Sequence, residues 1–391
     1  MPSDRRREEM SAKAILGKLV SFDTTSSKTN IPMAAWIRDY LAGLGIESHM
    51  LPAENGIHTN LFATIGELSD RGGIGLSGHM DVVPVTDQPW ETDPFTMVEK
   101  GSRLFGRGTS DMKGFLACML ASVPAFQARA LTQPIHLIFS YDEEVGCTGV
   151  IPMVAAFGKL LPKPDIVIVG EPSMMTVVDG HKGGARFRTD IVGKDAHSSR
   201  PELGVGSIFV AADLISELKR IETRIQKAYP APRFAPPFPT ITVSFIEGGI
   251  AHNIIPPHCS FQWGVRLTPG FDPNEAATAL QSYAERELLP KMRAVHAGCS
   301  IKTELLGLLP AFASGEGSPA TSLALKLAGQ NAIHTVPYGT EASHFQAAGC
   351  SAVVCGPGDI AQAHQPNEFI EAAELDNCMA FLARVGDWAA A

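Results

Sequence analysis

The chain has 391 residues, 45% of them hydrophobic and 19% charged, and single domains usually hold about 100–200 residues, so more than one core is expected. The formal net charge of -9 argues against a nucleic-acid partner, because such proteins depend on clustered lysine and arginine. No apolar run reaches the ~18–20 residues needed to cross a bilayer, so we expect no membrane span.

The first 181 residues alternate between helical and strand-like patterns. Apolar residues at helical spacing predict helices over residues 12–19, 31–44, 112–130 and 149–158. Short apolar runs bounded by turn residues predict strands over residues 60–64, 73–76, 135–140 and 166–169. Strands that alternate with helices indicate an α/β fold with a mixed, largely parallel sheet.

The pattern changes near residue 182. Strands are predicted over residues 185–192, 240–247 and 260–267, and helices over 207–227 and 273–289. This β-α-β-β-α order is typical of a small α+β, ferredoxin-like domain with helices on one face of its sheet. After residue 297 the α/β pattern resumes, with strands over 300–305 and 351–355, a helix over 319–329 and a terminal helix from residue 372. We therefore expect one catalytic domain, residues 1–181 and 297–391, interrupted by an inserted domain, residues 182–296.

The seven cysteines are an odd number and form no CxxC pair, which disfavours both a disulfide framework and a thiolate zinc site. The basic opening, residues 5–9, is not followed by an apolar segment of signal-peptide length. The sequence therefore predicts reduced thiols in a cytoplasmic protein.

Polar residues follow the predicted strands, where ligands of α/β sheets collect. The strand over residues 73–76 runs into His79 and Asp81, which face the same side of an extended chain. Asp81 could then orient the far nitrogen of His79, as carboxylates do behind metal-binding histidines. Taken alone, the pair is better explained by a capped loop with a satisfied histidine.

Four further loops offer acids or histidine. A glycine-punctuated loop, residues 106–114, delivers Asp111 at the start of a predicted helix, where a simple helix cap is the alternative. The strand over 135–140 ends in Asp142, Glu143 and Glu144, which alone would suit a solvated turn. Glu171 follows the strand over 166–169, and His364 follows the strand over 351–355.

Together these loops predict a metal site without cysteine ligands. Many carboxylates facing one cleft would repel one another and raise one another's pKa. Two divalent cations remove this problem, because three carboxylates and a hydroxide balance four positive charges. Histidine and carboxylate ligands suit Zn²⁺, with Co²⁺ or Mn²⁺ as substitutes.

In this order, and over essentially the whole chain, the motifs resemble the M20 metallohydrolases, which are dinuclear zinc deacylases and exopeptidases. The matching segments are residues 78–81, 108–114, 142–144 and 170–172, with the late histidine. The resemblance implies that one zinc is bound by His79 and Glu171, the other by His364 and Glu144, and both by Asp111. It further implies that Asp81 is the carboxylate that orients His79 and that Glu143 is the general base. The inserted domain would be a lid and the contact of a homodimer.

Three residues of the inserted domain also match the family. Residues 196–201 resemble the segment whose histidine reaches the active site across the dimer, which makes His197 a candidate oxyanion donor. Asn253 resembles an asparagine of the lid turn, and Arg266 resembles a contact to the substrate carboxylate. A surface-loop histidine and a solvated strand arginine are the alternatives, the latter because no second basic residue stands beside Arg266.

Residues 338–342, with Gly339, Thr340 and Glu341, resemble the branch of the family that acts on acetylornithine, in which a glutamate at this place suits a cationic side chain. Ser343 and His344 depart from that branch. We expect hydrolysis of N2-acetyl-L-ornithine to ornithine and acetate, in arginine biosynthesis. The alternatives are a succinyl-diaminopimelate desuccinylase, a broader N-acyl-amino-acid amidohydrolase or dipeptidase, and a catalytically silent binding module.

Overall fold

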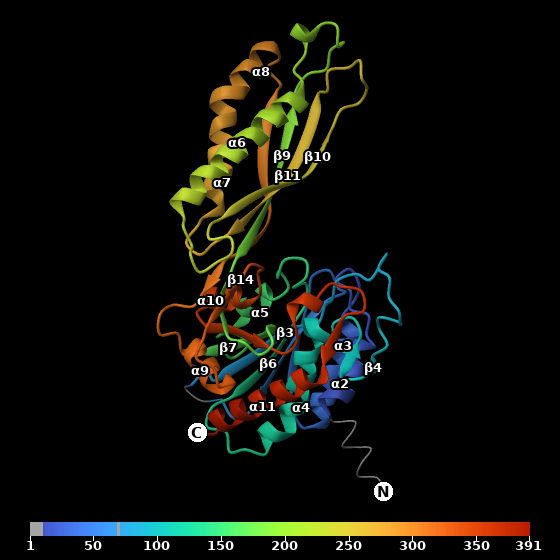
Figure 1. The fold of residues 1–391 in the computed structure, drawn as a ribbon, viewed down its shortest axis with the longest axis vertical. Helices are drawn as coiled ribbons and strands as arrows, with labels where there is room; N and C mark the ends of the chain where they lie inside the picture. Colours follow the sequence, from blue (N-terminus) through green and yellow to red (C-terminus); the bar gives the residue numbers. More distant parts are fainter. Residues whose placement is uncertain (1–10, 69–70) are drawn as a thin grey trace. The chain divides into compact units, whose positions relative to one another are not determined.

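The computed structural model describes residues 11–68 and 71–391, which divide into two compact units (Figure 1). Unit 1 comprises Met1–Gly180, Ala313–His334 and Thr340–Ala391, and unit 2 comprises His181–Phe312 and Thr335–Gly339. The basic opening, residues 5–9, lies outside the described residues. Among the described helices, none is both long enough and apolar enough to cross a membrane.

The larger sheet has nine strands, in the order β1-β2-β6-β3-β7-β15-β8-β13, with β14 paired to β8. Its strands are β1 Ser48–Pro52, β2 Thr59–Ile65, β3 Ile74–His79, β6 Ile135–Ser140, β7 Ile166–Pro172, β8 Val178–His181, β13 Phe312–Ala313, β14 His334–Val336 and β15 Ser351–Gly356. The central neighbours β6, β3, β7 and β15 run parallel to one another. Their apolar residues are buried on both faces, as expected for a parallel sheet covered by helices. The predicted α/β fold with a largely parallel sheet is confirmed.

Helices cover both faces of this sheet. One face carries α2 Ala12–Val20, α3 Ile31–Gly43, α4 Gly114–Gln127, α9 Pro319–Ala328 and α11 Ala372–Ala389, whose apolar residues form one core with the strands. Helices α4 and α11 lie side by side (Figure 1). The other face carries α5 Ile151–Ala156 and α10 Ala342–Ala347, where the rings of Phe157 and Phe345 stack. A separate three-stranded sheet is formed by β16 Phe369–Glu371, β5 Arg103–Phe105 and β4 Val98–Lys100.

The helix predicted over residues 112–130 begins later than expected. A short irregular turn, Thr109–Lys113, precedes α4, because Asp111 and Met112 have non-helical backbone angles. Asp111 has a φ of -123° and a ψ of 93°, so its side chain leaves the chain from a loop rather than from a regular helix. The glycines at 106 and 108, with φ of 158° and 83°, allow this path.

Unit 2 is a four-stranded antiparallel sheet covered by helices. Its elements are β9 Gly183–Val192, α6 Ser207–Ala228, β10 Thr240–Gly248, β11 His258–Leu267, α7 Pro273–Tyr283, α8 Leu289–Val295 and β12 Ser300–Leu309. The strand order is β10-β11-β9-β12, which with the βαββαβ chain order is a ferredoxin-like arrangement. Burial alternates along β9 and β11, because one face of the sheet packs against α6 and α7.

The second domain boundary differs from the predicted one. The strand beginning at Ser300 was assigned to the catalytic domain, yet β12 pairs with β9 along its length, with Ile301 opposite Ile191. Unit 2 therefore extends to Phe312 rather than to residue 296. The physical reason is that β9 would otherwise expose an unpaired edge, and β12 covers this edge and completes the sheet.

Candidate metal centre

The predicted ligands come from the carboxyl ends of the parallel strands in unit 1. His79 is the last residue of β3, and Glu171 lies near the end of β7. Glu144 follows β6, and His364 lies in the loop after β15. Because β6, β3, β7 and β15 are parallel neighbours, their ends meet at one edge of the sheet. Asp111 reaches the same place from the turn before α4.

Asp111 lies in the middle of the cluster and offers one carboxylate oxygen to each of two histidines. Its Oδ1 is 3.1 Å from His79 Nε2, and its Oδ2 is 3.3 Å from His364 Nε2. A glutamate completes each side: Glu171 Oε1 is 3.8 Å from His79 Nε2, and Glu144 Oε2 is 2.9 Å from His364 Nε2. The structure thus brings together all five predicted ligands, in two groups that share Asp111.

The ring of His79 is oriented by a backbone carbonyl. Its Nδ1 donates to the carbonyl oxygen of Asp81 at 2.9 Å, whereas Asp81 Oδ1 lies 3.6 Å from the same nitrogen. The sequence analysis expected the carboxylate to be this partner. The carboxylate instead accepts from the backbone N–H groups of Glu143, at 3.2 Å, and Glu144, at 3.3 Å. Asp81 therefore positions the histidine and both acids that follow β6.

The acids of the cluster raise one another's pKa. Burial raises the pKa of Glu143 to about 8, and the charges of neighbouring acids add to this effect. Burial likewise raises the pKa of Glu144 to about 7 and that of Glu171 well above its usual value. Burial acts in the same direction on Asp111, but hydrogen bonds from His364 and His79 outweigh it and lower the pKa of this carboxyl. Positive charge at the cluster would relieve this repulsion.

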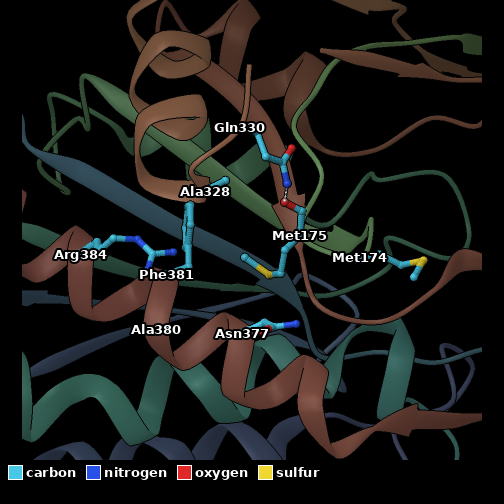
Figure 2. Close-up of a pocket in the computed structure, with 8 residues that line it drawn as sticks. All are labelled: Met174, Met175, Ala328, Gln330, Asn377, Ala380, Phe381 and Arg384. Carbon is cyan, nitrogen blue, oxygen red and sulfur yellow. Dashed lines mark hydrogen bonds between the residues drawn. The ribbon is translucent and has the colours of Figure 1, made fainter. Parts of the chain in front are cut away.

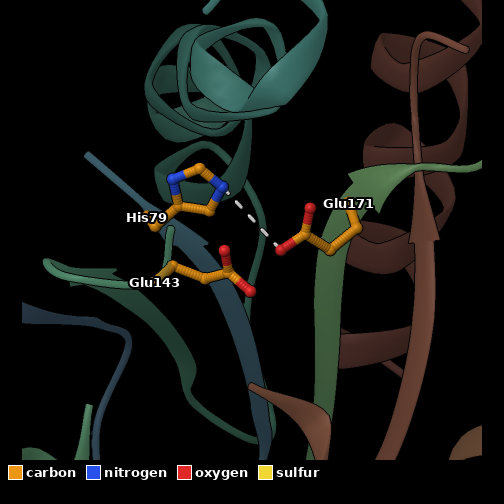
Figure 3. Close-up of side chains that lie close together, drawn as sticks. All are labelled: His79, Glu143 and Glu171. Atoms are coloured by element: carbon orange, nitrogen blue, oxygen red, sulfur yellow. Dashed lines mark ion pairs between the residues drawn. The ribbon is translucent and has the colours of Figure 1, made fainter. Parts of the chain in front are cut away.

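This donor set fits a divalent cation. Glu143 and Glu171 converge on His79 (Figure 3), and the three offer ligand atoms that lie within 4.8 Å of one another, as do His79, Asp111 and Glu144. The Oε1 atom of Glu171 is buried and has no hydrogen-bond partner among the described residues. A buried acceptor without a donor is costly unless a cation or a proton completes it. Imidazoles and carboxylates together are typical ligands of Zn²⁺ and related ions.

A cysteine that the sequence analysis gave no role contacts the predicted general base. The thiol of Cys147 donates to Glu143 Oε1 at 3.0 Å. Burial raises the pKa of this thiol well above its usual value, so the sulfur keeps its proton. Cys147 has a φ of 57°, and this turn in the loop after β6 directs the thiol back to Glu143. Only the four-residue spacing between them could have suggested the contact, and that spacing is not specific.

Glu341 and Thr340 are buried in unit 1. The Glu341 side chain is 1% exposed, and burial raises its pKa to about 7, partly opposed by the Ser140 hydroxyl beside it. The Thr340 hydroxyl accepts from the backbone N–H of Ala342 at 3.2 Å. Ser140 ends β6 and is paired with His79 of β3, so Glu341 lies among residues that support the metal cluster.

The other predicted residues belong to unit 2. His197 is exposed, and its Nδ1 lies 2.7 Å from the hydroxyl of Ser199. Asn253 is exposed beside the bridge between His197 and Ile254, and Gly339 is half-buried. Exposed Arg266 lies opposite Gly184 in the pairing of β11 with β9.

A second basic residue, which the sequence analysis did not single out, lies near Arg266. Lys182 precedes β9, and its Nζ donates to the carbonyl of Phe238 at 3.0 Å. Burial and the charge of Arg266 lower the pKa of Lys182. Arg266 is therefore not the lone cation of its surroundings, which weakens the interpretation of a merely solvated strand residue.

A pocket of about 300 Å³ in unit 1 contains none of the predicted ligands (Figure 2). It is lined by Met174, Met175, Ala328, Gln330, Asn377, Ala380, Phe381 and Arg384. The amide of Gln330 donates to the carbonyl of Met175 at 2.9 Å, and Arg384 donates to the carbonyl of Leu327. These polar groups hold neighbouring backbone together, and we assign the pocket no part in catalysis.

Comparison with known proteins agrees with this arrangement. The family described as "Peptidase family M20/M25/M40" matches residues 75–387. The chain is 34% identical to an acetylornithine deacetylase of Proteus mirabilis over 90% of this chain and 89% of that protein. It is 35% identical to an acetylornithine deacetylase of Myxococcus xanthus, over 95% and 96% of the two chains.

Solved structures share the fold at low sequence identity. The aminopeptidase PepT of Bacillus cereus has a TM-score of 0.77 at 20% identity, with 98% of this chain and 99% of that chain covered. YXEP of Bacillus subtilis, described as a dinuclear metal-binding peptidase, has a TM-score of 0.66 at 17% identity, with 96% of each chain covered. The resemblance drawn from the sequence motifs is thus confirmed, and this chain belongs to peptidase family M20/M25/M40.

Proposed function

We propose that this protein hydrolyses N2-acetyl-L-ornithine to L-ornithine and acetate, a reaction that supplies ornithine for arginine biosynthesis. The observation that carries the proposal is the carboxylate of Asp111, which offers one oxygen to His79 and the other to His364. Similarity to acetylornithine deacetylases over about nine-tenths of the chain supports the substrate. The seven buried free thiols favour a cytoplasmic location for this reaction.

Two Zn²⁺ ions are the proposed cofactors, with Co²⁺ as a substitute. His79 and Glu171 would hold one ion, His364 and Glu144 the other, and Asp111 both. When bound, the ions would polarise the amide carbonyl and lower the pKa of a water molecule from about 15.7 towards ~7. Neutral imidazole is required for this, and the Asp81 carbonyl already accepts the Nδ1 proton of His79, which leaves Nε2 for the ion.

Glu143 is the proposed general base and acid. Its carboxylate lies beside the two ligand groups, and Asp81 holds its backbone N–H while Cys147 donates to its Oε1. Glu143 would take a proton from the attacking water and then give it to the leaving amine nitrogen, so one carboxyl serves both steps. The catalytically silent alternative is disfavoured because every group needed for these two proton transfers is present.

A homodimer is proposed from the surface of unit 2. Strand β10 is an edge of its sheet, and apolar side chains there and nearby are exposed. Phe209 is 83% exposed, Ile250 72%, and Phe245 and Ile246 52% each. An edge strand with exposed apolar residues is a surface that proteins usually cover with a partner. In such a dimer, His197 would donate a hydrogen bond to the oxyanion in the active site of the partner subunit.

Mixed dimers test this role of His197. A His197→Ala homodimer should be slower by about 10²–10³-fold, as for loss of one oxyanion donor. A Glu143→Ala chain paired with a His197→Ala chain contains one complete active site if His197 acts across subunits. Activity should therefore reappear on mixing the two inactive variants under conditions that exchange subunits. Absence of recovery, with dimers verified by differently tagged chains, would show that His197 does not act in this way.

The choice of substrate is tested by a panel assayed with zinc-loaded enzyme. We expect kcat/KM for acetylornithine to exceed that for succinyl-diaminopimelate by more than about tenfold, which corresponds to ~1.4 kcal/mol of differential binding. Faster turnover of the succinyl compound would reject acetylornithine.

Glu341→Gln extends the panel, with N-acetylmethionine as a control substrate that has no cationic side chain. If Glu341 recognises the ornithine ammonium, the variant loses activity towards acetylornithine alone. Equal loss for both substrates would mean that this buried carboxyl supports the site rather than selecting the side chain.

A further inference from the structure

We infer that Glu368 and Arg107 are positioning residues that hold Asp111 and His364 in place as ligands of a shared cation, an inference that rests on the proposed metal-dependent function. Neither was singled out by the sequence analysis. Glu368 lies four residues after His364, and Arg107 lies four residues before Asp111. Each residue therefore lies in the same segment of the chain as one of the two proposed ligands.

Glu368 anchors the backbone of the Asp111 loop. Its carboxylate is 1% exposed and accepts three backbone N–H groups. Oε1 accepts from Ser110, at 2.9 Å, and from Asp111, at 3.1 Å, and Oε2 accepts from Gly108, at 2.9 Å. Residues 109–113 form no regular helix, so these amides have no standard helical partners. One carboxylate therefore fixes the path of the chain on which the bridging ligand stands.

Arg107 balances the buried charge of Glu368. Its Nη1 lies 2.7 Å from Glu368 Oε2, and both side chains are 1% exposed. The guanidinium also lies over the ring of Trp90, 5.1 Å from the ring centroid. A buried ion pair costs much to break, because removal of one partner leaves the other charge uncompensated. The pair is therefore a rigid support rather than a flexible surface contact.

The same arginine extends the network to His364. Its Nη2 donates to Gln88 Oε1 at 2.6 Å, and Gln88 Nε2 donates to the carbonyl of His364 at 3.0 Å. His364 needs this support, since its side chain is 53% exposed and its φ of 64° lies in the left-handed region that non-glycine residues seldom adopt. Its ring lies 3.3 Å from Asp111 Oδ2, and Gln88 holds the backbone from which the ring extends.

The network should act on cation affinity mainly at one side of the cluster. His79 and Glu171 are placed by strands β3 and β7, and none of the contacts from Glu368, Arg107 and Gln88 described above reaches them. Residues that orient metal ligands typically change metal affinity by about 10–100-fold when they are replaced. Because Asp111 is shared by the two sides, we expect both cations to be weakened, and the cation held by His364, Glu144 and Asp111 to be weakened most.

The test is a competition titration of zinc against a chelator, applied to full-length Glu368→Gln. The carboxamide of this variant keeps one acceptor oxygen, but its N–H₂ group would face N–H donors that the carboxylate oxygen accepts in the wild-type chain. We expect the weaker of the two successive zinc affinities to fall by about 10–100-fold and the stronger one to fall less. Turnover should fall at limiting zinc and recover as zinc is added, which a general loss of folding would not allow.

Glu371→Gln is the matched control. Glu371 is three residues away on the same segment and pairs with Arg103, at 2.7 Å, and with the hydroxyl of Ser102, at 2.7 Å, near the surface. Its replacement removes the same charge without touching the ligand loops, so both zinc affinities should match wild type.

Gln88→Ala keeps the inference open to test if Glu368→Gln does not fold. Gln88 is partly exposed, and its loss removes the bridge from Arg107 to His364 together with the acceptor of the Trp90 indole N–H, but leaves the contacts of Glu368 in place. We expect one zinc affinity to fall by about tenfold. Unchanged zinc binding in Gln88→Ala, or in folded Glu368→Gln, would overturn the inference. A wild-type chain that binds no zinc would overturn the proposed function itself, and the wild-type titration reveals this separately.

Discussion

Glu143→Gln should lower kcat for acetylornithine by about 10²–10⁴-fold while zinc binding survives. The carboxamide has nearly the shape of the carboxylate but cannot accept the proton of the attacking water. Asp81 would still hold the backbone of residue 143, so the loop should keep its course. The measurements are steady-state kinetics and zinc content by elemental analysis of the same preparation.

Zinc content also distinguishes two roles of Glu143. Its carboxylate lies with His79 and Glu171 in a group that could hold an ion, so a ligand role is the alternative. Loss of one zinc together with activity would assign Glu143 to the ligand set and leave the base unidentified. Glu371→Gln, which removes a surface carboxylate, should keep both activity and zinc.

Asp111→Ala should remove both zinc ions and reduce activity to background. Its two oxygens face different histidines, so no other single residue of the cluster serves both sides. Zinc at about 100 times its dissociation constant should stabilise the wild-type chain by ~2.7 kcal/mol for each occupied site, and this gain should vanish in the variant. Thermal unfolding with and without zinc measures the difference.

Glu171→Gln is the comparison for that experiment, because it changes only the side that contains His79. It should keep one zinc and part of the stabilisation. Equal loss of zinc in both variants would mean that the two sites do not share Asp111 in the proposed way.

Strand positions predicted the grouping of four of the five proposed ligands, because each of the four lies at or after the end of a parallel strand and such strands end at a common edge. Asp111 comes from the turn before α4, and the division of the five between two ions came from the family resemblance. For His79, Glu144, Glu171 and His364 the strand positions, which apolar runs reveal, indicated a shared edge of the sheet, and the resemblance to the M20 family supplied their roles. The approximate boundaries of these strands were sufficient, since a loop residue reaches the same edge of the sheet whether the strand ends one residue earlier or later.

The supporting residues could not be predicted in this way. Cys147, Arg107 and Glu368 act through side-chain direction and through contacts up to 261 residues apart in the chain, as between Arg107 and Glu368. Hydrophobic periodicity carries no information on such pairs. The strand beginning at Ser300 was assigned to the wrong unit for a related reason: its pattern shows a strand, but only the unpaired edge of β9 determines its sheet.

In the proposed arrangement, the shared carboxylate of Asp111 would make the two cation sites thermodynamically dependent on each other. An ion held by one oxygen would change the charge and the orientation of the carboxylate, so the first ion would alter the free energy with which the second binds. Linkage requires this influence to be reciprocal and equal in size, whichever site is filled first. Occupancy of the pair is therefore a collective property of the cluster, and successive dissociation constants describe the pair rather than either ion.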